Sequence, residues 1–374
     1  MSSSLHTDVG TPGLLPLPAN LPVEWEQVRT VLLCQGEPAW VPFMEDELAL
    51  SHRERVLGRP PRTLTDEVDV ARRLGQPFVR VTISLQNHPV VKVAISADDM
   101  QPRSAAAGDR AWVREQRGVI GAQADMEAFP WPTPDDFDYG VLDEADRTLP
   151  DSFKLVVAVG KIFNLGWWLM GFEQYCLALH DQPAMVEELH ARIARIQMGI
   201  VERALEHKCV GAIRHADDMA YRTGLMTSPT ILRRCILPYY RTINRECQLR
   251  DIPVIFHSDG KMDDLMEDIV HAGFSAFNPI EPLAMDIVAL KKRVGGRLAL
   301  IGNVDLSYTL TLGTPAEVDA EVKQLIRKVA PGGGFGLASA NSVPEYVPWE
   351  NLVAMHTAWL TYGRYPINGG RRWL

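Results

Sequence analysis

The sequence predicts an α/β protein built as a single (β/α)₈ barrel, a TIM barrel, with a long excursion after its second strand. Three observations predict this fold class: the length of the chain, an alternation of apolar and amphipathic stretches, and polar residues where the apolar stretches end. With 374 residues, 46% of them hydrophobic, the chain is long enough for a barrel of about 250 residues. Its 23% of charged residues is typical of a soluble globular protein.

Short runs of β-branched and apolar residues alternate with amphipathic stretches long enough to be helices, which is the pattern of parallel βα units. Eight such runs occur, the number that a closed barrel of this type needs. The predicted strands are residues 40–45, 78–83, 155–160, 211–217, 253–259, 276–281, 298–305 and 334–341. The helical pattern is clearest over residues 183–208 and from Pro315 to about Val329.

The domain organisation follows from this alternation. We expect residues 1–24 to form an N-terminal arm and residues 25–374 to form the barrel. Residues 85–150 are rich in Pro, Asp, Gly and Ala and should form the excursion, with short strands at 90–95 and 118–123. An excursion of this length is usually a functional lid, although a surface cover for the barrel rim fits equally well.

Charge and composition exclude several classes of protein. The formal net charge of -9 has no compensating basic block, which argues against a nucleic-acid partner. No apolar run approaches the roughly 20 residues of a membrane span, and the N-terminus lacks the pattern of a signal peptide. The five cysteines show no paired spacing and fit reduced thiols. We therefore expect a cytoplasmic protein.

Five successive predicted strands change from apolar to polar at the same relative position, where a barrel carries its active site. These strand ends carry Arg214, Asp217 and Asp218, then His257 and Asp259, then Asn278 and Glu281, then Asn303 and Asp305, and finally Asn341. Capping of the following helix would explain any one of them. Five in a row, with a histidine and a glutamate among them, favour a shared polar pocket.

The pocket would hold several carboxylates against few cations, chiefly Arg80, Arg214 and Arg222. Because carboxylates crowded in a dry site cannot all stay ionised, a metal ion, a cationic ligand or a proton-transfer role must balance them. His257 and Asp259 could ligate a metal or act as an acid/base pair. The candidate catalytic residues are His257, Asp217, Asp218 and Glu281.

From Asp217 to Asn351 the chain resembles the uroporphyrinogen decarboxylase (URO-D) superfamily, a group of (β/α)₈-barrel enzymes. The motifs that carry the resemblance keep their order and spacing. They are Asp217-Asp218 with Thr227-Ser228-Pro229, His257-Ser258-Asp259-Gly260, Asn278-Pro279-Ile280-Glu281-Pro282, Gly302-Asn303-Val304-Asp305, Gly313-Thr314-Pro315-Ala316-Glu317-Val318, Gly332-Gly333-Gly334-Phe335 and Val347-Pro348-Trp349-Glu350-Asn351. Upstream, Met170-Gly171-Phe172-Glu173 and Trp131-Pro132-Thr133-Pro134-Asp135-Asp136 also match.

The chain departs from both well-known branches of this superfamily. True decarboxylases resemble one another in an early Met-Arg-Gln-Ala-Gly-Arg-Tyr motif, where this chain has the acidic segment Phe43-Met44-Glu45-Asp46-Glu47. Thiol-acceptor methyltransferases bind zinc with His-x-Cys and a later Cys, where this chain keeps His257 but has Asp259 and Asn341. The resemblance therefore indicates a divergent member outside the haem-pathway decarboxylases and closer to the methyltransferase-like branch.

The resemblance implies an enzyme, and three functions stay open. The first is a methyltransferase-like enzyme for a small methylated compound, served by a corrinoid protein partner or by zinc or another divalent metal held by His257, Asp259 and Glu281. The second is a decarboxylase of a small or porphyrinogen-like acid, and the third is a non-catalytic binding barrel. Members of the family often form homodimers. The residues expected to bind substrate are Glu45, Arg80, Glu173, Arg214, Asn278, Asn303, Asp305 and Asn341.

Overall fold

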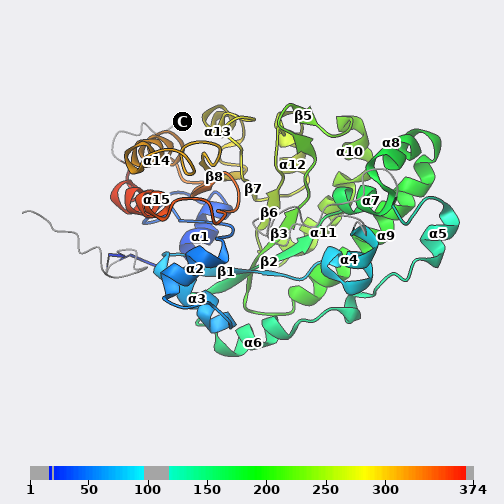
Figure 1. The fold of residues 1–374 in the computed structure, drawn as a ribbon, viewed down its shortest axis with the longest axis horizontal. Coiled ribbons are helices and arrows are strands. Elements are labelled where there is room, and N and C mark those ends of the chain that lie inside the picture. Colours follow the sequence, from blue (N-terminus) through cyan, green and yellow to red (C-terminus); the bar gives the residue numbers. More distant parts are fainter. Residues whose placement is uncertain (1–16, 19–20, 97–117, 368–374) are drawn as a thin grey trace, which may run out of the picture. The chain divides into compact units, whose positions relative to one another are not determined.

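The computed structural model describes residues 17–18, 21–96 and 118–367. The chain divides into two compact units, a terminal unit of residues 1–79 with 287–374 and a central unit of residues 80–286. Helices and parallel strands alternate in both (Figure 1). The strand β1 (Phe78–Thr82) crosses the division between the two units.

The central unit is organised by parallel strands in the order β1-β2-β3-β6-β7. Their bounds are β2 Lys154–Gly160, β3 Val210–Ala216, β6 Val254–His257 and β7 Ala276–Asn278. Leu155 pairs with Val210, Ile213 with Val254, and Ile255 with Ala276. The short strands β4 (Ala220–Tyr221) and β5 (Gly224–Leu225) form a separate antiparallel hairpin. The carboxyl ends of β3, β6 and β7 therefore meet at one edge.

Helices connect these strands, as the alternating pattern predicts. The α-helices of the central unit are α4 Pro89–Ile95, α5 Gln123–Ala128, α6 Gly140–Thr148, α7 Phe163–Met170, α8 Phe172–Asp181, α9 Pro183–Ala204, α10 Pro229–Cys235, α11 Leu237–Gln248 and α12 Met266–His271. Three short 3₁₀ helices, η1 Leu85–Asn87, η2 Pro134–Asp136 and η3 Asp263–Leu265, complete it. The 22-residue α9 buries Leu189, Ile193 and Ile200 along one stripe, so it can pack on the sheet at β2.

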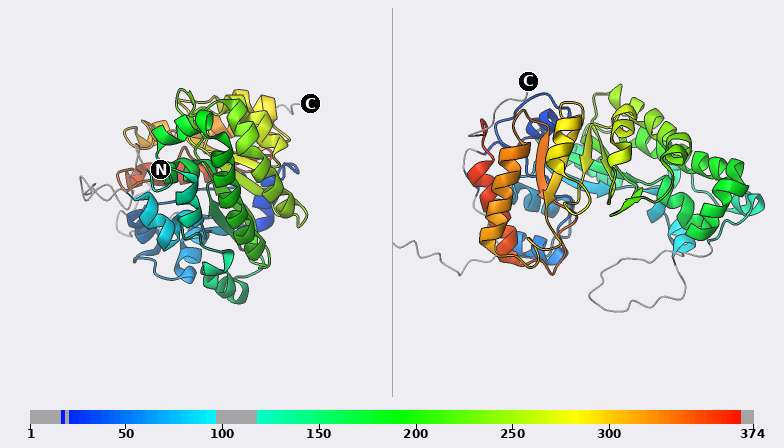
Figure 2. Two further views of the ribbon diagram at one scale, coloured as in Figure 1. Left: turned by 90° about the vertical axis from the view of Figure 1, so that its right-hand side faces the viewer. Right: turned by 90° about the horizontal axis from the view of Figure 1, so that it is seen from above.

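The terminal unit contains two parallel strands and six helices among its described residues. Their bounds are α1 Trp25–Leu32, α2 Leu50–Leu57, α3 Leu64–Arg73, α13 Ile287–Val294, β8 Ala299–Val304, α14 Pro315–Val329, β9 Phe335–Ser339 and α15 Trp349–Tyr362. Leu300 pairs with Phe335 in a parallel register. Helices α14 and α15 pack side by side, as the orange and red helices of Figure 2 show.

The predicted strand at residues 40–45 is wrong as a regular strand. The segment is extended and makes only isolated bridges, in which Phe43 pairs in parallel with Leu337 of β9. The N–H of Met44 donates to the carbonyl of Leu337 at 2.8 Å, and the N–H of Leu337 donates to that of Pro42 at 2.9 Å. Pro42 lacks an N–H group, which limits the ladder that this segment can build. It nevertheless occupies the place of a strand beside β9.

The predicted short strands inside the excursion are also wrong. Residues 90–95 lie in the helix α4, because Pro89 fits its first turn and Val91, Ala94 and Ile95 bury one face. No strand forms over residues 118–123, which lead into α5. Apart from residues 97–117, which lie outside the described part, the excursion consists of short helices and turns. Most of the predicted arm, residues 1–24, also lies outside the described residues.

A buried carboxylate ties the end of β3 to two helices of the central unit. Asp217 has no exposed surface and follows β3 directly. One of its oxygens accepts hydrogen bonds from the N–H groups of Ile162 and Phe163 at 3.0 and 2.8 Å, and from the Tyr240 hydroxyl at 2.7 Å. The other accepts from the N–H of Asn164 at 2.8 Å. Asp217 thereby caps the N-terminus of α7, where unpaired N–H groups and the helix dipole favour an anion.

Among the described residues, none of the helices combines the length and the apolar character needed to pass through a bilayer. The longest, α9, carries charged residues along its solvent-facing side.

Replacing Asp217 by Asn should destabilise the central unit by about 2–4 kcal/mol, because the amide group would turn a donor toward N–H groups that are themselves donors. Tyr240→Phe removes only one of the four hydrogen bonds and should cost about 1–2 kcal/mol. Urea unfolding of both variants against the wild type measures the difference. Equal stabilities of Asp217→Asn and wild type would contradict the capping role.

Candidate active site

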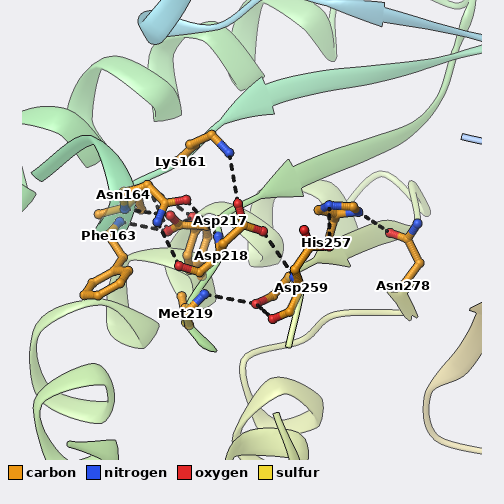
Figure 3. A network of polar contacts seen from close by, with 12 residues as sticks. Lys161, Phe163, Asn164, Asp217, Asp218, Met219, His257, Asp259 and Asn278 are labelled. Carbon is orange, nitrogen blue, oxygen red and sulfur yellow. Dashed lines mark hydrogen bonds and ion pairs between the residues drawn. The ribbon is translucent and has the colours of Figure 1, made fainter. Parts of the chain in front are cut away.

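The polar strand ends of the central unit converge on one small group of side chains. Asp218 follows β3, while His257 ends β6 and Asp259 lies two residues beyond it. One ligand atom from each of these three residues lies within 4.8 Å of those of the other two. Figure 3 shows the three side chains between Lys161 on one side and Asn278 on the other. The ends of β3 and β6 therefore bring these three side chains together.

Asp218 is the half-buried acid of this group. Its backbone is fixed by Asn164, whose side-chain oxygen accepts from the Asp218 N–H at 2.8 Å and whose amide donates to the Asp218 carbonyl at 2.7 Å. Burial alone would raise the pKa of Asp218. The charges of Lys161, His257 and Arg214 and the N–H of Asp259 outweigh burial and hold that pKa below its usual value. Asp218 is therefore an anion at neutral pH.

His257 is oriented by its neighbour on β7. Its Nδ1 lies 3.3 Å from Oδ1 of Asn278. This contact is a hydrogen bond when Nδ1 carries a proton, because an amide oxygen can only accept. The other ring nitrogen, Nε2, faces Oδ1 of Asp259 at 3.6 Å, which is longer than a hydrogen bond. The imidazole side chain is only 12% exposed, so Nε2 points into the group rather than to bulk water.

The loop after β6 is held in place by backbone contacts. The N–H of Met219 donates to the Ser258 hydroxyl at 3.0 Å, and the N–H of Asp259 donates to Asp218 at 3.1 Å. Gly260 adopts a φ of +82°, and a Cβ there would lie 2.6 Å from the carbonyl oxygen of Ala220. Only glycine fits this turn. The loop thus places Asp259 beside Asp218.

The other predicted residues of the central unit lie around this group or away from it. Glu281 is half-buried; burial and the charge of Asp218 raise its pKa, against the N–H of Gly260 and the charge of Arg222. It is not a member of the metal-competent group, where Asp218 stands instead. Arg214 is buried on β3, and Arg80 lies half-buried on β1. Glu173 is exposed in the first turn of α8, so the structure does not bring it to a strand end.

Two residues of the site were missed at the sequence level. Lys161 follows β2 directly, and its Nζ lies 3.8 Å from Oδ2 of Asp218. Its ammonium also lies 5.3 Å from the centre of the Trp168 ring, a cation–π distance. The strand-end rule could have found Lys161, because β2 obeys it like the later strands. Asn164 carries no such signal, since its role rests on contacts with residues more than 50 positions away.

The remaining predicted residues belong to the terminal unit. Glu45 is buried, and one of its oxygens accepts from the Ser339 N–H at 2.9 Å while the other contacts the Ser339 hydroxyl. The same hydroxyl contacts the carbonyl of Asn341. Since a hydroxyl has one proton, it can donate to Asn341 while accepting a proton from a neutral Glu45. Burial raises the pKa of Glu45 to about 7, in agreement with that arrangement.

Two further residues of the terminal unit lie at the carboxyl end of β8. Asn303 is buried at its end. Asp305 accepts hydrogen bonds from the N–H groups of Ser307 and Tyr308 at 2.8 and 3.1 Å, so it caps a turn. This is the capping role that competes with a binding role at any strand end.

Glu45→Gln should change how stability depends on pH. Because the pKa of Glu45 in the folded protein, about 7, lies above its ordinary value of 4.5, the folded state binds more protons in this window, and wild-type stability falls as pH rises from about 4.5 to 7. A glutamine mimics the neutral acid. The free energy of unfolding of Glu45→Gln relative to the wild type should therefore increase across that window, by at most about 3 kcal/mol. Urea unfolding at several pH values measures this, with the exposed Glu54→Gln as control. A constant difference would contradict the neutral form.

Comparison with known proteins adds to this geometry. A family model described as uroporphyrinogen decarboxylase (URO-D) matches residues 119–362. A uroporphyrinogen decarboxylase of Pseudomonas aeruginosa is 25% identical over 284 residues, covering 71% of this chain and 77% of the relative. A methylcobamide:CoM methyltransferase, MtaA, of Methanosarcina barkeri is 30% identical over 105 residues, which are 28% of this chain and 29% of the relative.

A solved structure shares the fold. The methyltransferase from Methanosarcina mazei aligns with a TM-score of 0.63 at 16% identity and covers 90% of this chain and 98% of its own. This likeness confirms the predicted α/β fold of the TIM-barrel type, although the described residues form a sheet of seven strands instead of the predicted closed barrel of eight. The family match covers well over half of the chain and contains β2 through β9 with the Asp218–His257–Asp259 group. The chain therefore belongs to the uroporphyrinogen decarboxylase family, as a divergent member near its methyltransferase-like branch.

Proposed function

We propose that this chain is a methyltransferase-like enzyme that acts on a small methylated compound and holds a divalent metal ion with Asp218, His257 and Asp259. The observation that carries the proposal is the convergence of these three ligand atoms within 4.8 Å at the ends of β3 and β6. In the same proposal, a corrinoid protein is the partner that gives or takes the methyl group. The match to the URO-D family supports an enzymatic role for this fold.

The geometry of the group fits a metal ion. Two ligands about 2.1 Å from a tetrahedral ion stand about 3.4 Å apart, close to the 3.6 Å between His257 Nε2 and Asp259 Oδ1. With the proton of His257 on Nδ1, the lone pair of Nε2 faces an anionic carboxylate. Only a cation between the two, whether a second proton or a metal, makes that contact favourable. Asn278 then acts as the outer partner that fixes the ring of a ligating histidine.

The donor set also limits which ion fits. One imidazole and two carboxylates suit zinc, manganese, iron or cobalt, whereas two thiolates would favour softer ions. When bound, such an ion polarises a substrate oxygen or lowers the pKa of a bound acceptor group. Glu281, with its raised pKa, lies near Gly260 and can exchange a proton with the acceptor. Asp217 stays out of this chemistry, because both of its oxygens are occupied by the donors that cap α7.

Lys161 and Trp168 supply the remaining side of the site. The ammonium of Lys161 neutralises Asp218 while no metal is bound, and it lies over the Trp168 ring. A flat apolar wall beside a charged centre suits a small methylated compound, which has little to hydrogen-bond. The site therefore pairs a polar end for the reacting group with an aromatic face for the rest of the substrate.

Metal titration of the purified protein tests the proposal. His257→Ala and Asp259→Asn should each weaken binding of Zn²⁺ or Mn²⁺ by about 100-fold or more, since each removes a ligand. Lys161→Met should strengthen binding about tenfold, because a competing cation is removed from Asp218. Calorimetry with the exposed His180→Ala as control measures all four. A metal-free wild type with full methyl transfer, or no response to Lys161→Met, would contradict the metal site.

A second candidate function is decarboxylation of a small or porphyrinogen-like acid. The similarity to uroporphyrinogen decarboxylases over 71% of the chain favours it, and so does the charge of the buried Arg214 acting on Asp218. In this reaction Arg214 and Lys161 would seat the departing carboxylate, while His257 in its protonated form would supply the proton to the carbanion carbon.

Release of CO₂ from a candidate acid, without added metal, distinguishes the two functions. Arg214→Gln should lower kcat/KM for that release by about 100-fold, because the carboxylate loses its charged partner. The exposed Arg195→Gln on α9 is the matched control. Unchanged release by Arg214→Gln would exclude this seating of the carboxylate.

We place the enzyme in the cytoplasm as part of the proposal. All five cysteines are free thiols, three of them buried, which is the usual state in a reducing compartment.

A further inference from the structure

The terminal unit contains a cavity beside the first residues of its strands β8 and β9. The polar residues described above lie at the other end of these strands. The volume of the cavity is about 870 Å³. Its walls come from the loop after α1, the end of α13 with the following glycines, and the end of α14 with the loop before β9. The cavity thus lies where β8 and β9 begin, whereas Asn303 and Ser339 lie where these strands end. It is a separate place from the proposed active site.

The charge on the walls is positive. Lys291, Lys292 and Lys328 line the cavity, and among the described residues Glu37 is the acidic residue on its walls. This concentration does not follow from the composition, because the whole chain has a net charge of -9. Lys292 and Lys328 are exposed, while Lys291 is partly buried and donates to the carbonyl groups of Gly333 and Gly334. An anion would find up to three ammonium groups there.

The backbone adds a second feature. Gly36, Gly296 and Gly332 line the same cavity with φ values of +116°, +83° and +86°. A Cβ on any of the three would meet no atom within 4 Å, so these glycines serve the backbone conformation rather than close packing. Glycine loops of this kind leave N–H groups accessible and form nests for phosphate groups.

The chain itself already presents an anion to one of these N–H groups. The Glu37 carboxylate accepts a hydrogen bond from the N–H of Gly332 at 2.8 Å. Glu37 is exposed, so a stronger anion can displace it. The position of its carboxylate shows where an anion bound by this N–H group would lie.

From these four observations we propose that this cavity binds a phosphoryl group, either as a free inorganic anion or as part of a small phosphate ester. Lysines act as point charges for phosphate, and the volume admits a drug-sized ligand. The competing explanation is that Lys291, Lys292 and Lys328 only compensate the dipoles at the ends of α13 and α14. That explanation accounts for Gly296 and Gly332, which follow the ends of these helices, but it predicts neither the cavity between them nor the positive φ of Gly36 on its wall.

Calorimetry on the full chain at constant ionic strength tests the proposal, with inorganic pyrophosphate and glucose 6-phosphate as the two probes. Lys328→Glu, an exposed position, should weaken binding at least tenfold. Glu37→Gln should strengthen it severalfold, because the internal competitor loses its charge. Lys323→Glu carries the same charge change on the same helix outside the cavity and should leave binding nearly unchanged.

Saturable binding of pyrophosphate alone assigns the site to an inorganic anion, and binding of the ester assigns it to an organic phosphate. Either result supports the proposal if Lys328→Glu weakens binding and Glu37→Gln strengthens it. No saturable binding of either probe, or equal losses in Lys328→Glu and Lys323→Glu, would overturn it. This outcome is independent of metal binding at His257, because it uses phosphate probes and variants of the terminal unit, whereas the metal titration uses divalent ions and variants of the central unit.

Discussion

The central unit depends on one buried anion. Asp217 joins the end of β3 to the N-terminus of α7 and to Tyr240 of α11 through four hydrogen bonds. A carboxylate without exposed surface is unfavourable unless donors replace the water that it loses. The start of α7 supplies three N–H groups that would otherwise lack partners. Two unfavourable features, a buried charge and an open helix end, therefore compensate each other.

This anchor determines the role of the next residue. Asp218 is turned toward His257 and Asp259 because Asp217 and Asn164 fix the backbone on either side of its side chain. Adjacent aspartates in one motif thus have different tasks: Asp217 holds the scaffold, and Asp218 faces the site. Their pKa values shift in opposite directions, since burial dominates at Asp217 while neighbouring positive charges dominate at Asp218. Rigid support of this kind holds side-chain atoms within a fraction of an ångström of the positions that binding requires.

Much of this arrangement could be predicted from the sequence, and the rest could not for physical reasons. Apolar runs such as that of β2 are recognisable because both faces are buried, and the polar residues after them mark the strand ends. Residues 90–95 were misjudged because their β-branched side chains fit a strand, whereas Pro89 and tertiary packing select a helix. The group formed by Asp218, His257 and Asp259 depends on contacts between distant residues, so the polar strand ends indicate its region but do not select Asp218 as the third member.

In the proposed metal site the ligands are oxygen and nitrogen donors, without a thiolate. An aspartate at position 259 would place a negative charge beside His257 and present a hard oxygen donor, which would favour hard divalent ions over soft ones. The neighbouring Lys161 has a further consequence, because its ammonium lies 3.8 Å from Asp218 and opposes any cation that binds there. A metal ion at this site must therefore displace or tolerate a positive charge. In the proposed function, metal binding at His257 would then depend on what occupies the Lys161 side of the site, and would be coupled to substrate binding beside Trp168.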